Sequence, residues 1–191
     1  MIQLSIISFS DKWVTAAVHK NIRRNILSNP IQAIESVKTL SKGAVAQLFD
    51  GKCVVSVRQI HAAAVATHLA FKAKSNISKK FDIEFLLRLA ADTQIGRVLE
   101  KIGIKAETKE IGYCVIAEDK NTVLKISKDI VRLIGGEPME EDELKREDRL
   151  SEAMKFYGIT EKEVDAVQAP SKADAVLLLI LERIATLDLK R

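Results

Sequence analysis

The sequence predicts an α+β fold, with a small mixed β-sheet covered by several helices in a single domain that spans residues 1–191. Two apolar, β-branched runs, residues 2–8 and 110–117, indicate strands that share one sheet. Most of the remaining chain has apolar residues at the spacing of amphipathic helices. A few strands among many helices favour the α+β class.

The first part of the chain is expected to continue mainly as helices after its first strand. Ser10 and Asp11 are suitable caps for a helix that runs to about Leu27, where Asn29-Pro30 closes it. The further elements predicted here are a helix at 31–41, a short helix at 44–49 and a strand-like run at 53–55.

The middle of the chain is predicted to hold its longest helix. Ser56 is a suitable N-cap for a helix to about Lys74, in which Val57, Ile60 and Phe71 mark a buried stripe. The elements predicted after it are helices at 81–90, 94–102 and 121–134, with a strand at 111–116.

Residues 137–149 form an acidic, proline-containing connector, which we expect to be a solvated bridge. Beyond it, apolar residues at helical spacing predict a helix at 148–157 that Gly158 ends. The last predicted elements are a short turn at 161–166, capped by Thr160, and a helix from Ser171 to about Leu187.

The composition, 47% hydrophobic and 29% charged, is that of an ordinary globular protein. No apolar run approaches the roughly 20 residues of a membrane-spanning helix, and the first residues do not resemble a signal peptide. Cys53 and Cys114 are far apart and form no CxxC motif, so we expect buried free thiols. These features predict a cytoplasmic protein without a membrane partner.

The net charge of +4 is distributed unevenly. Residues 58–109 carry ten Lys or Arg against five Asp or Glu, whereas residues 137–191 carry nine against fourteen. A basic part attracts nucleic acid and an acidic part repels it. The asymmetry suggests a molecule with two functional faces, although solvated surface charge without a role explains it as well.

Known catalytic motifs are missing from the sequence. It has no Gly-rich phosphate loop, no GxSxG and no HExxH. His61 and His68 lie on one predicted helix, where they are more typical of half-buried, hydrogen-bonded side chains than of a metal site or a base. We therefore expect neither an enzyme nor a bound cofactor or metal.

Basic side chains give a stronger signal. Arg58 and Lys72 share one helix face, because fourteen residues make about four turns. The start of the helix near Thr93 and Gln94 offers free N–H groups to a phosphate or a nucleotide. The complete predicted RNA surface is Arg58, Lys72, Lys74, Lys79, Lys80, Arg88, Thr93, Gln94 and Arg97.

The last predicted helix has two apolar stripes. Leu177, Ile180 and Ile184 lie on one of them, and Leu178 and Ala185 lie on the other. A single stripe is enough for packing on a domain, so the second indicates either a central helix or a partner.

The block AADTQIGRVLEKIGI, residues 90–104, resembles the PRPK-binding protein family, the small regulatory subunit of the KEOPS complex. Archaeal members have a similar RQIGxAIxKxGI block after a helix ending in LLRLA, which is residues 86–90 here. The resemblance covers roughly residues 45–190. Thr93 departs from the pattern, because relatives are expected to have Arg or Asn there.

The resemblance implies a subunit without chemistry of its own. KEOPS makes N6-threonylcarbamoyladenosine in tRNAs that read codons beginning with A. This subunit is expected to dock on the N-lobe of the kinase-like ATPase subunit, to support its activity, and to bind the 3′ CCA end of the tRNA. The predicted kinase-binding residues are Leu150, Met154, Tyr157, Leu178 and Ala185.

Two other interpretations remain open at the level of sequence. The chain is either a purely protein-binding regulator, whose basic half makes no RNA contact, or an enzyme that uses His61 or His68.

Overall fold

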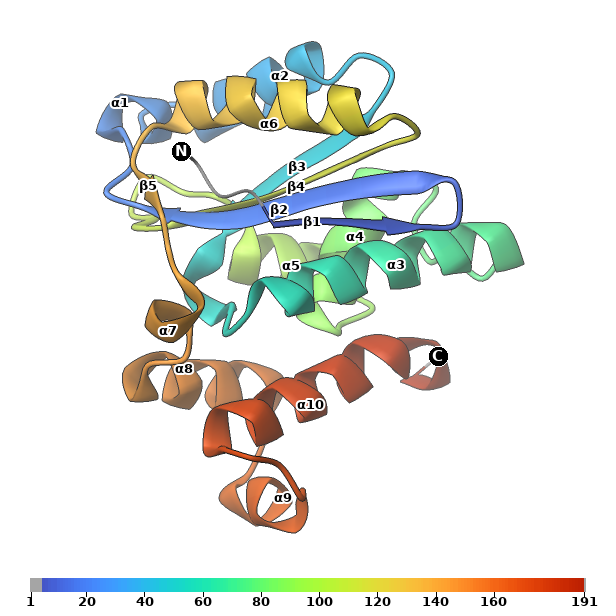
Figure 1. Cartoon of the computed structure of the whole chain (residues 1–191), viewed down its shortest axis with the longest axis vertical. Coiled ribbons are helices and arrows are strands. Elements are labelled where there is room, and N and C mark those ends of the chain that lie inside the picture. Colours follow the sequence, from blue (N-terminus) through green and yellow to red (C-terminus); the bar gives the residue numbers. More distant parts are fainter. Residues whose placement is uncertain (1–4, 191) are drawn as a thin grey trace.

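A β-sheet separates two groups of helices in this chain (Figure 1). The computed structural model describes residues 5–190. The strands are β1 (Ser5–Phe9), β2 (Lys12–Lys20), β3 (Val45–Asp50), β4 (Ile111–Ala117) and β5 (Glu137–Pro138). The helices are α1 (Arg24–Leu27), α2 (Pro30–Leu40), α3 (Val57–Ala73), α4 (Phe81–Ala90), α5 (Ile95–Ile102), α6 (Lys120–Ile134), α7 (Glu141–Leu144), α8 (Glu147–Tyr157), α9 (Glu161–Ala166) and α10 (Lys172–Ala185).

The strands pair in the order β1-β2-β4-β3, and the short β5 pairs with the end of β2. Ile116 of β4 lies opposite Val14 of β2 on one side and Val45 of β3 on the other. The two predicted strands share this sheet, with β2 between them, although residues 2–4 lie outside the described range. The α+β class is confirmed, but every pairing among residues 5–190 is antiparallel, so the expected mixed sheet is corrected.

The helix predicted from Ser10 to about Leu27 is wrong except for its last turn, Arg24–Leu27, which forms α1. Phe9 pairs directly with Lys12, so Ser10 and Asp11 form the two-residue turn of a β-hairpin, with Ser10 at a positive φ of 51°. The following strand β2 is buried from Val14 to His19 because it lies in the middle of the sheet with helices on both faces. Such a strand lacks the alternation of polar and apolar residues that identifies a half-buried strand.

Two further predictions in the first third of the chain are wrong. Residues 44–49 were expected to be helical, but Val45–Asp50 form β3 along the edge of β4. The strand-like run at 53–55 is not a strand, because Cys53 ends a short 3-10 helix, Gly51–Cys53, and Val54 and Val55 pair with no strand. Pairing with β4 decides the structure of Val45–Asp50, because strand pairing and burial override the weak helical preference of its Ala, Gln and Leu residues.

The other predicted helices are confirmed, and their end signals explain why. Ser56, Thr160 and Ser171 each accept a hydrogen bond from a backbone N–H in the first turn of α3, α9 and α10. Gly158 ends α8 in the left-handed conformation that glycine adopts without strain. These boundaries depend on local chemistry, which sequence reasoning reads well.

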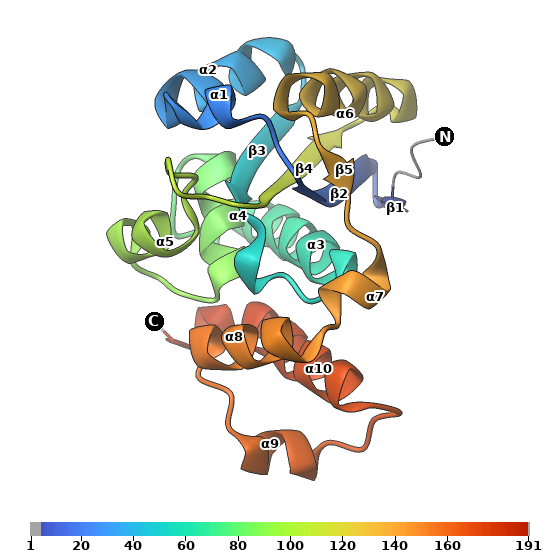
Figure 2. The same cartoon turned by 90° about the vertical axis from the view of Figure 1, so that its left-hand side faces the viewer.

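Helices cover both faces of the sheet (Figures 1 and 2). The helices α1, α2 and α6 pack on one face, where Tyr113 and Val115 point into their core cluster. The helices α3, α4 and α5 cover the other face, on which Val14 and Ile116 are buried. Below them, α10 lies alongside α3, next to α8, while α9 forms the far end of the molecule. None of the helices in residues 5–190 has the length and apolarity that crossing a membrane requires.

The acidic connector at 137–149 exposes most of its acidic side chains, as predicted, but it is also packed against the domain. Met139 and Leu144 are buried, and the connector contains β5 and α7. Glu141 accepts hydrogen bonds from the Val57 backbone N–H at 2.9 Å and from the Ser56 hydroxyl at 3.3 Å. A carboxylate at the start of a helix stabilises its free N–H groups and its positive dipole end. The connector thus holds the first turn of α3 in place.

Candidate functional site

A groove of about 460 Å³ runs between α3 and α10. Its walls are apolar, and one end is formed by Arg88 and Asp188. The apolar lining residues are Ala62, Val65, Ala66, Leu69, Ala70 and Ala73 from α3, and Leu181, Ile184 and Ala185 from α10. The small alanine side chains of α3 leave the space open, because larger residues at this helical spacing would fill it.

Two large apolar side chains beside this groove are unusually exposed. Leu69 of α3 is 54% exposed and Leu178 of α10 is 46% exposed. Leu178 shares a face with Leu181 and Ala185, because the three follow the i, i+3 and i+7 spacing of one helix stripe. Exposed apolar side chains next to an apolar groove are typical of a site of interaction with another macromolecule.

Buried charges close one end of the groove. The Arg88 guanidinium donates to Glu84 at 3.0 Å and to both carboxylate oxygens of Asp188, at 2.7 and 3.1 Å. Glu84 is fully buried and also accepts from the backbone N–H groups of Ile77 and Ser78. Arg88 is only 2% exposed, so its prediction as an RNA contact is wrong. Its bonds to Asp188 hold the final 3-10 helix, Leu187–Lys190, against α4 instead.

The predicted kinase-binding residues divide into two groups. Leu150 and Met154 are 3% and 6% exposed and belong to the core cluster beneath the sheet, so they offer no surface to a partner. The Tyr157 hydroxyl is used internally, because it donates to the Leu89 carbonyl and accepts from Gln59, both at 2.6 Å. The apolar stripe of α8 is therefore covered by the chain itself.

Leu178 and Ala185 remain exposed and stay predicted contacts. The α3 side of the groove is what sequence reasoning missed. Its signal was present, because Ala62, Ala66 and Leu69 follow i, i+4 and i+7 spacing on a face other than the buried stripe.

The predicted RNA residues do not form a single patch. Lys72 and Lys74 at the end of α3 and Lys79 and Lys80 in the next loop are exposed and make no ion pair among residues 5–190. Arg58 lies at the opposite end of α3, fourteen residues or roughly 21 Å away along the helix axis. The structure thus supports one basic cluster, of Lys72, Lys74, Lys79 and Lys80, which we call the lysine cluster.

The start of α5 is a separate location, at the far end of α4 from Lys80. Its N-cap is Gln94, whose backbone N–H donates to the Asp92 carboxylate at 3.0 Å. Arg97 bonds to the side chains of Asp92 and Gln94. The Asp92 carboxylate thus lies beside the helix start, although no side chain caps the first turn of α5, and Thr93 is half-buried in the preceding turn.

The histidines of α3 pack beneath the edge strand β1. The His68 ring meets the Phe9 ring edge-on at 5.3 Å. Burial lowers the pKa of His61 from 6.5 to about 4, and its Nε2 has no hydrogen-bond partner among the described residues. Both cysteines are buried free thiols, as predicted. In the described part of the chain, no three His, Cys, Asp or Glu side chains gather into a possible metal site.

A comparison with known families shows which family this chain belongs to. The family described as kinase binding protein CGI-121 matches residues 12–188, from the first residue of β2 to the final 3-10 helix. The chain belongs to this family. The match includes both helices of the groove and confirms the family resemblance that residues 90–104 indicate. No curated protein matches the chain.

Proposed function

We propose that this chain is a non-catalytic KEOPS subunit that docks on the kinase-like ATPase subunit, supports its activity and binds the 3′ CCA end of tRNA for N6-threonylcarbamoyladenosine modification. The observation that carries the proposal is the open apolar groove between α3 and α10 in a member of a kinase-binding family. The occupant of the groove is the N-lobe of the ATPase, and the chemistry belongs to the other subunits.

The groove has the properties of a protein interface. Leu69 and Leu178 each leave about half of the side chain in water, and covering that apolar area contributes roughly 1 kcal/mol per residue. The alanines of α3 allow a partner helix or strand to approach closely. Asp188 at the groove end is bonded to the Arg88 guanidinium, which also bonds to the buried Glu84, so the carboxylate there has a cationic partner.

Substituting charged residues for apolar ones at the groove tests whether the ATPase subunit docks there. Leu69→Arg and Leu178→Arg should each abolish co-purification with the ATPase subunit, because the new guanidinium loses its hydration in the interface. Ile31→Arg is the matched control, since Ile31 is 70% exposed on α2, on the other side of the sheet. Circular dichroism checks that all three variants are folded. Native affinity in both groove variants would place the ATPase elsewhere.

The lysine cluster is the proposed contact for the tRNA 3′ end. Its four exposed ammonium groups can follow a single-stranded backbone. Lys79→Glu/Lys80→Glu should weaken tRNA binding, whereas Lys155→Glu/Lys162→Glu, which changes exposed lysines of α8 and α9, should not.

Removing the 3′ tail from the tRNA makes this test specific. Loss of the tail should weaken binding to the native chain and leave the binding of Lys79→Glu/Lys80→Glu unchanged, because the two changes remove the same contact. Equal tRNA binding by native chain and variant would support the alternative, a purely protein-binding regulator.

A further inference from the structure

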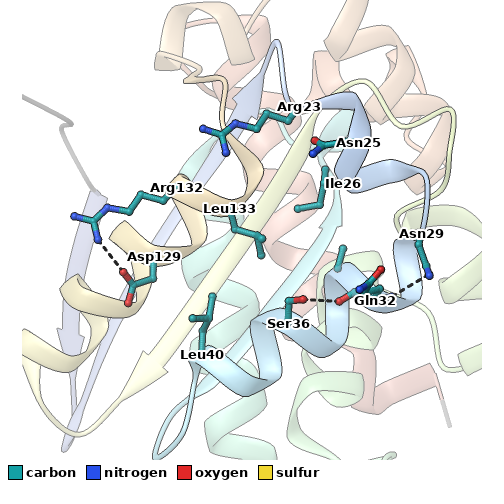
Figure 3. Close-up of a pocket in the computed structure, with 11 residues that line it drawn as sticks. Arg23, Asn25, Ile26, Asn29, Gln32, Ser36, Leu40, Asp129, Arg132 and Leu133 are labelled. Carbon is teal, nitrogen blue, oxygen red and sulfur yellow. Dashed lines mark hydrogen bonds and ion pairs between the residues drawn. The ribbon is translucent and has the colours of Figure 1, made fainter.

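A second hollow lies on the side of the sheet opposite the α3–α10 groove. It has a volume of about 640 Å³ and runs between α2 and α6. Figure 3 shows Arg23, Asn25 and Ile26 at one end, Leu40 at the other, and Asp129 and Arg132 along the α6 side. Leu133 and Ile26 supply an apolar floor, and amide and hydroxyl groups of α1 and α2 supply hydrogen-bonding partners.

Uncompensated positive charge surrounds this hollow. Residues 21–44 carry four basic side chains and one acidic one, and residues 120–134 carry the same. Arg23, Arg24, Lys42, Lys125 and Lys128 are all exposed and have no ion-pair partner among residues 5–190. The net field over this face is therefore strongly positive, which favours an anionic ligand.

The C-terminal helices do not have this pattern. Lys145 pairs with Asp174 at 3.5 Å, Lys172 with Glu147 at 3.0 Å, and Arg183 with Glu163 at 2.8 Å. Basic side chains near α8–α10 are thus mostly neutralised by carboxylates, whereas those around the α2–α6 hollow are mostly not.

The positive surface extends beyond the hollow. Lys38, near the end of α2, pairs with Asp82 of α4 at 3.1 Å, and both line a smaller hollow together with Lys80. This smaller hollow joins the end of α2 to the lysine cluster. A basic path that passes over two elements suits an elongated polyanion better than a compact acidic group.

The lining of the α2–α6 hollow distinguishes between kinds of nucleic acid. None of its eleven lining residues is aromatic, so it offers no platform on which unpaired bases could stack. Arginine, asparagine, glutamine and serine side chains are suited to phosphate oxygens and ribose hydroxyls, which a helical RNA presents along its minor groove.

We propose that the hollow between α2 and α6 binds the sugar–phosphate backbone of a double-stranded RNA segment. Lys125 and Lys128 lie one helical turn before Asp129 and Arg132, so they extend the α6 wall and contact phosphates. Asn25 and Gln32 make uncharged hydrogen bonds inside the hollow. The inference goes beyond the proposed 3′-end contact, and it places the double-stranded RNA segment on the side of the sheet opposite the α3–α10 groove.

A blunt RNA duplex without a 3′ overhang is the probe, so failure of the 3′-end proposal leaves the result unaffected. Lys125→Glu/Lys128→Glu in the full chain should lower duplex affinity roughly tenfold and reduce the slope of log K against log salt by roughly 2. The control Lys155→Glu/Lys162→Glu, with the same change in net charge, should bind as the native chain does.

A second variant tests whether the RNA enters the hollow. Asn25→Ala/Gln32→Ala should weaken duplex binding several-fold with an unchanged salt slope, because no charge is removed. The proposal is overturned if Lys125→Glu/Lys128→Glu binds the duplex normally, or if the control loses as much affinity. It is also overturned if that variant loses binding to a poly-glutamate peptide while keeping the duplex, which would assign the face to an acidic protein.

Discussion

Replacing Arg88 by methionine tests the interpretation of the buried charges at the groove end. The substitution keeps an unbranched apolar chain but leaves Glu84, which is fully buried, without its cationic partner. An uncompensated buried carboxylate costs about 3 to 5 kcal/mol. Asp188 is 40% exposed, so Asp188→Asn should cost no more than about 1 kcal/mol.

Urea unfolding followed by circular dichroism measures these differences. Arg88→Met/Glu84→Gln should be more stable than Arg88→Met alone, because glutamine leaves no buried charge and its oxygen still accepts from the backbone at Ile77 and Ser78. An Arg88→Met chain destabilised by less than about 1 kcal/mol would refute the reasoning. So would an equal effect of Asp188→Asn.

Two further predictions concern α3. Glu141→Gln should lower the free energy of unfolding by about 1 kcal/mol, because the carboxylate caps the helix at Val57, whereas Asp142→Asn on the exposed side of α7 should change it little. The pKa of His61 is about 4 in the folded chain and 6.5 in the unfolded one, so only the unfolded chain takes up a proton between these values. The free energy of unfolding should therefore fall by roughly 3 kcal/mol as the pH drops from 6.5 to 4. His61→Leu should lack this part of the decrease in urea titrations at a series of pH values, and an unchanged pH dependence would contradict the assignment.

The helices were predictable from sequence where their ends carry chemical signals. Ser56, Thr160 and Ser171 each accept a bond from their own first turn, and such a bond depends on residues only a few positions apart in the chain. The strand β2 was not predictable by the same reasoning. Ser10 and Asp11 suit a helix cap and a tight turn equally, and only pairing with β1 and β4 selects the turn.

The candidate site, too, was only partly predictable from the sequence, because some of its contacts are made by residues far apart in the chain. The second apolar stripe of α10, with Leu178 and Ala185, was visible in the sequence and is exposed. Both Leu150 and Leu178 lie on amphipathic helices. Leu150 is buried because α8 is covered by the chain, whereas Leu178 is exposed because part of α10 is not covered. Arg88 was misassigned for a related reason, since its partner Asp188 is a hundred residues away in the chain. Spacing within one helix carries no information about such distant contacts.

The pairing of β2 with β4 has a consequence for the order in which the chain folds. The ion pair between Lys12 and Glu118, beside this ladder, joins residues 106 positions apart. On the ribosome, the β1–β2 hairpin must therefore wait until β4 has left the exit tunnel before the sheet can close. Long-range pairing of this kind makes folding slow, because the entropy of a large loop is lost before the contacts form. Until β4 arrives, Val14 to Val18 remain an unpaired apolar edge, and this segment is the part of the nascent chain on which a chaperone would act.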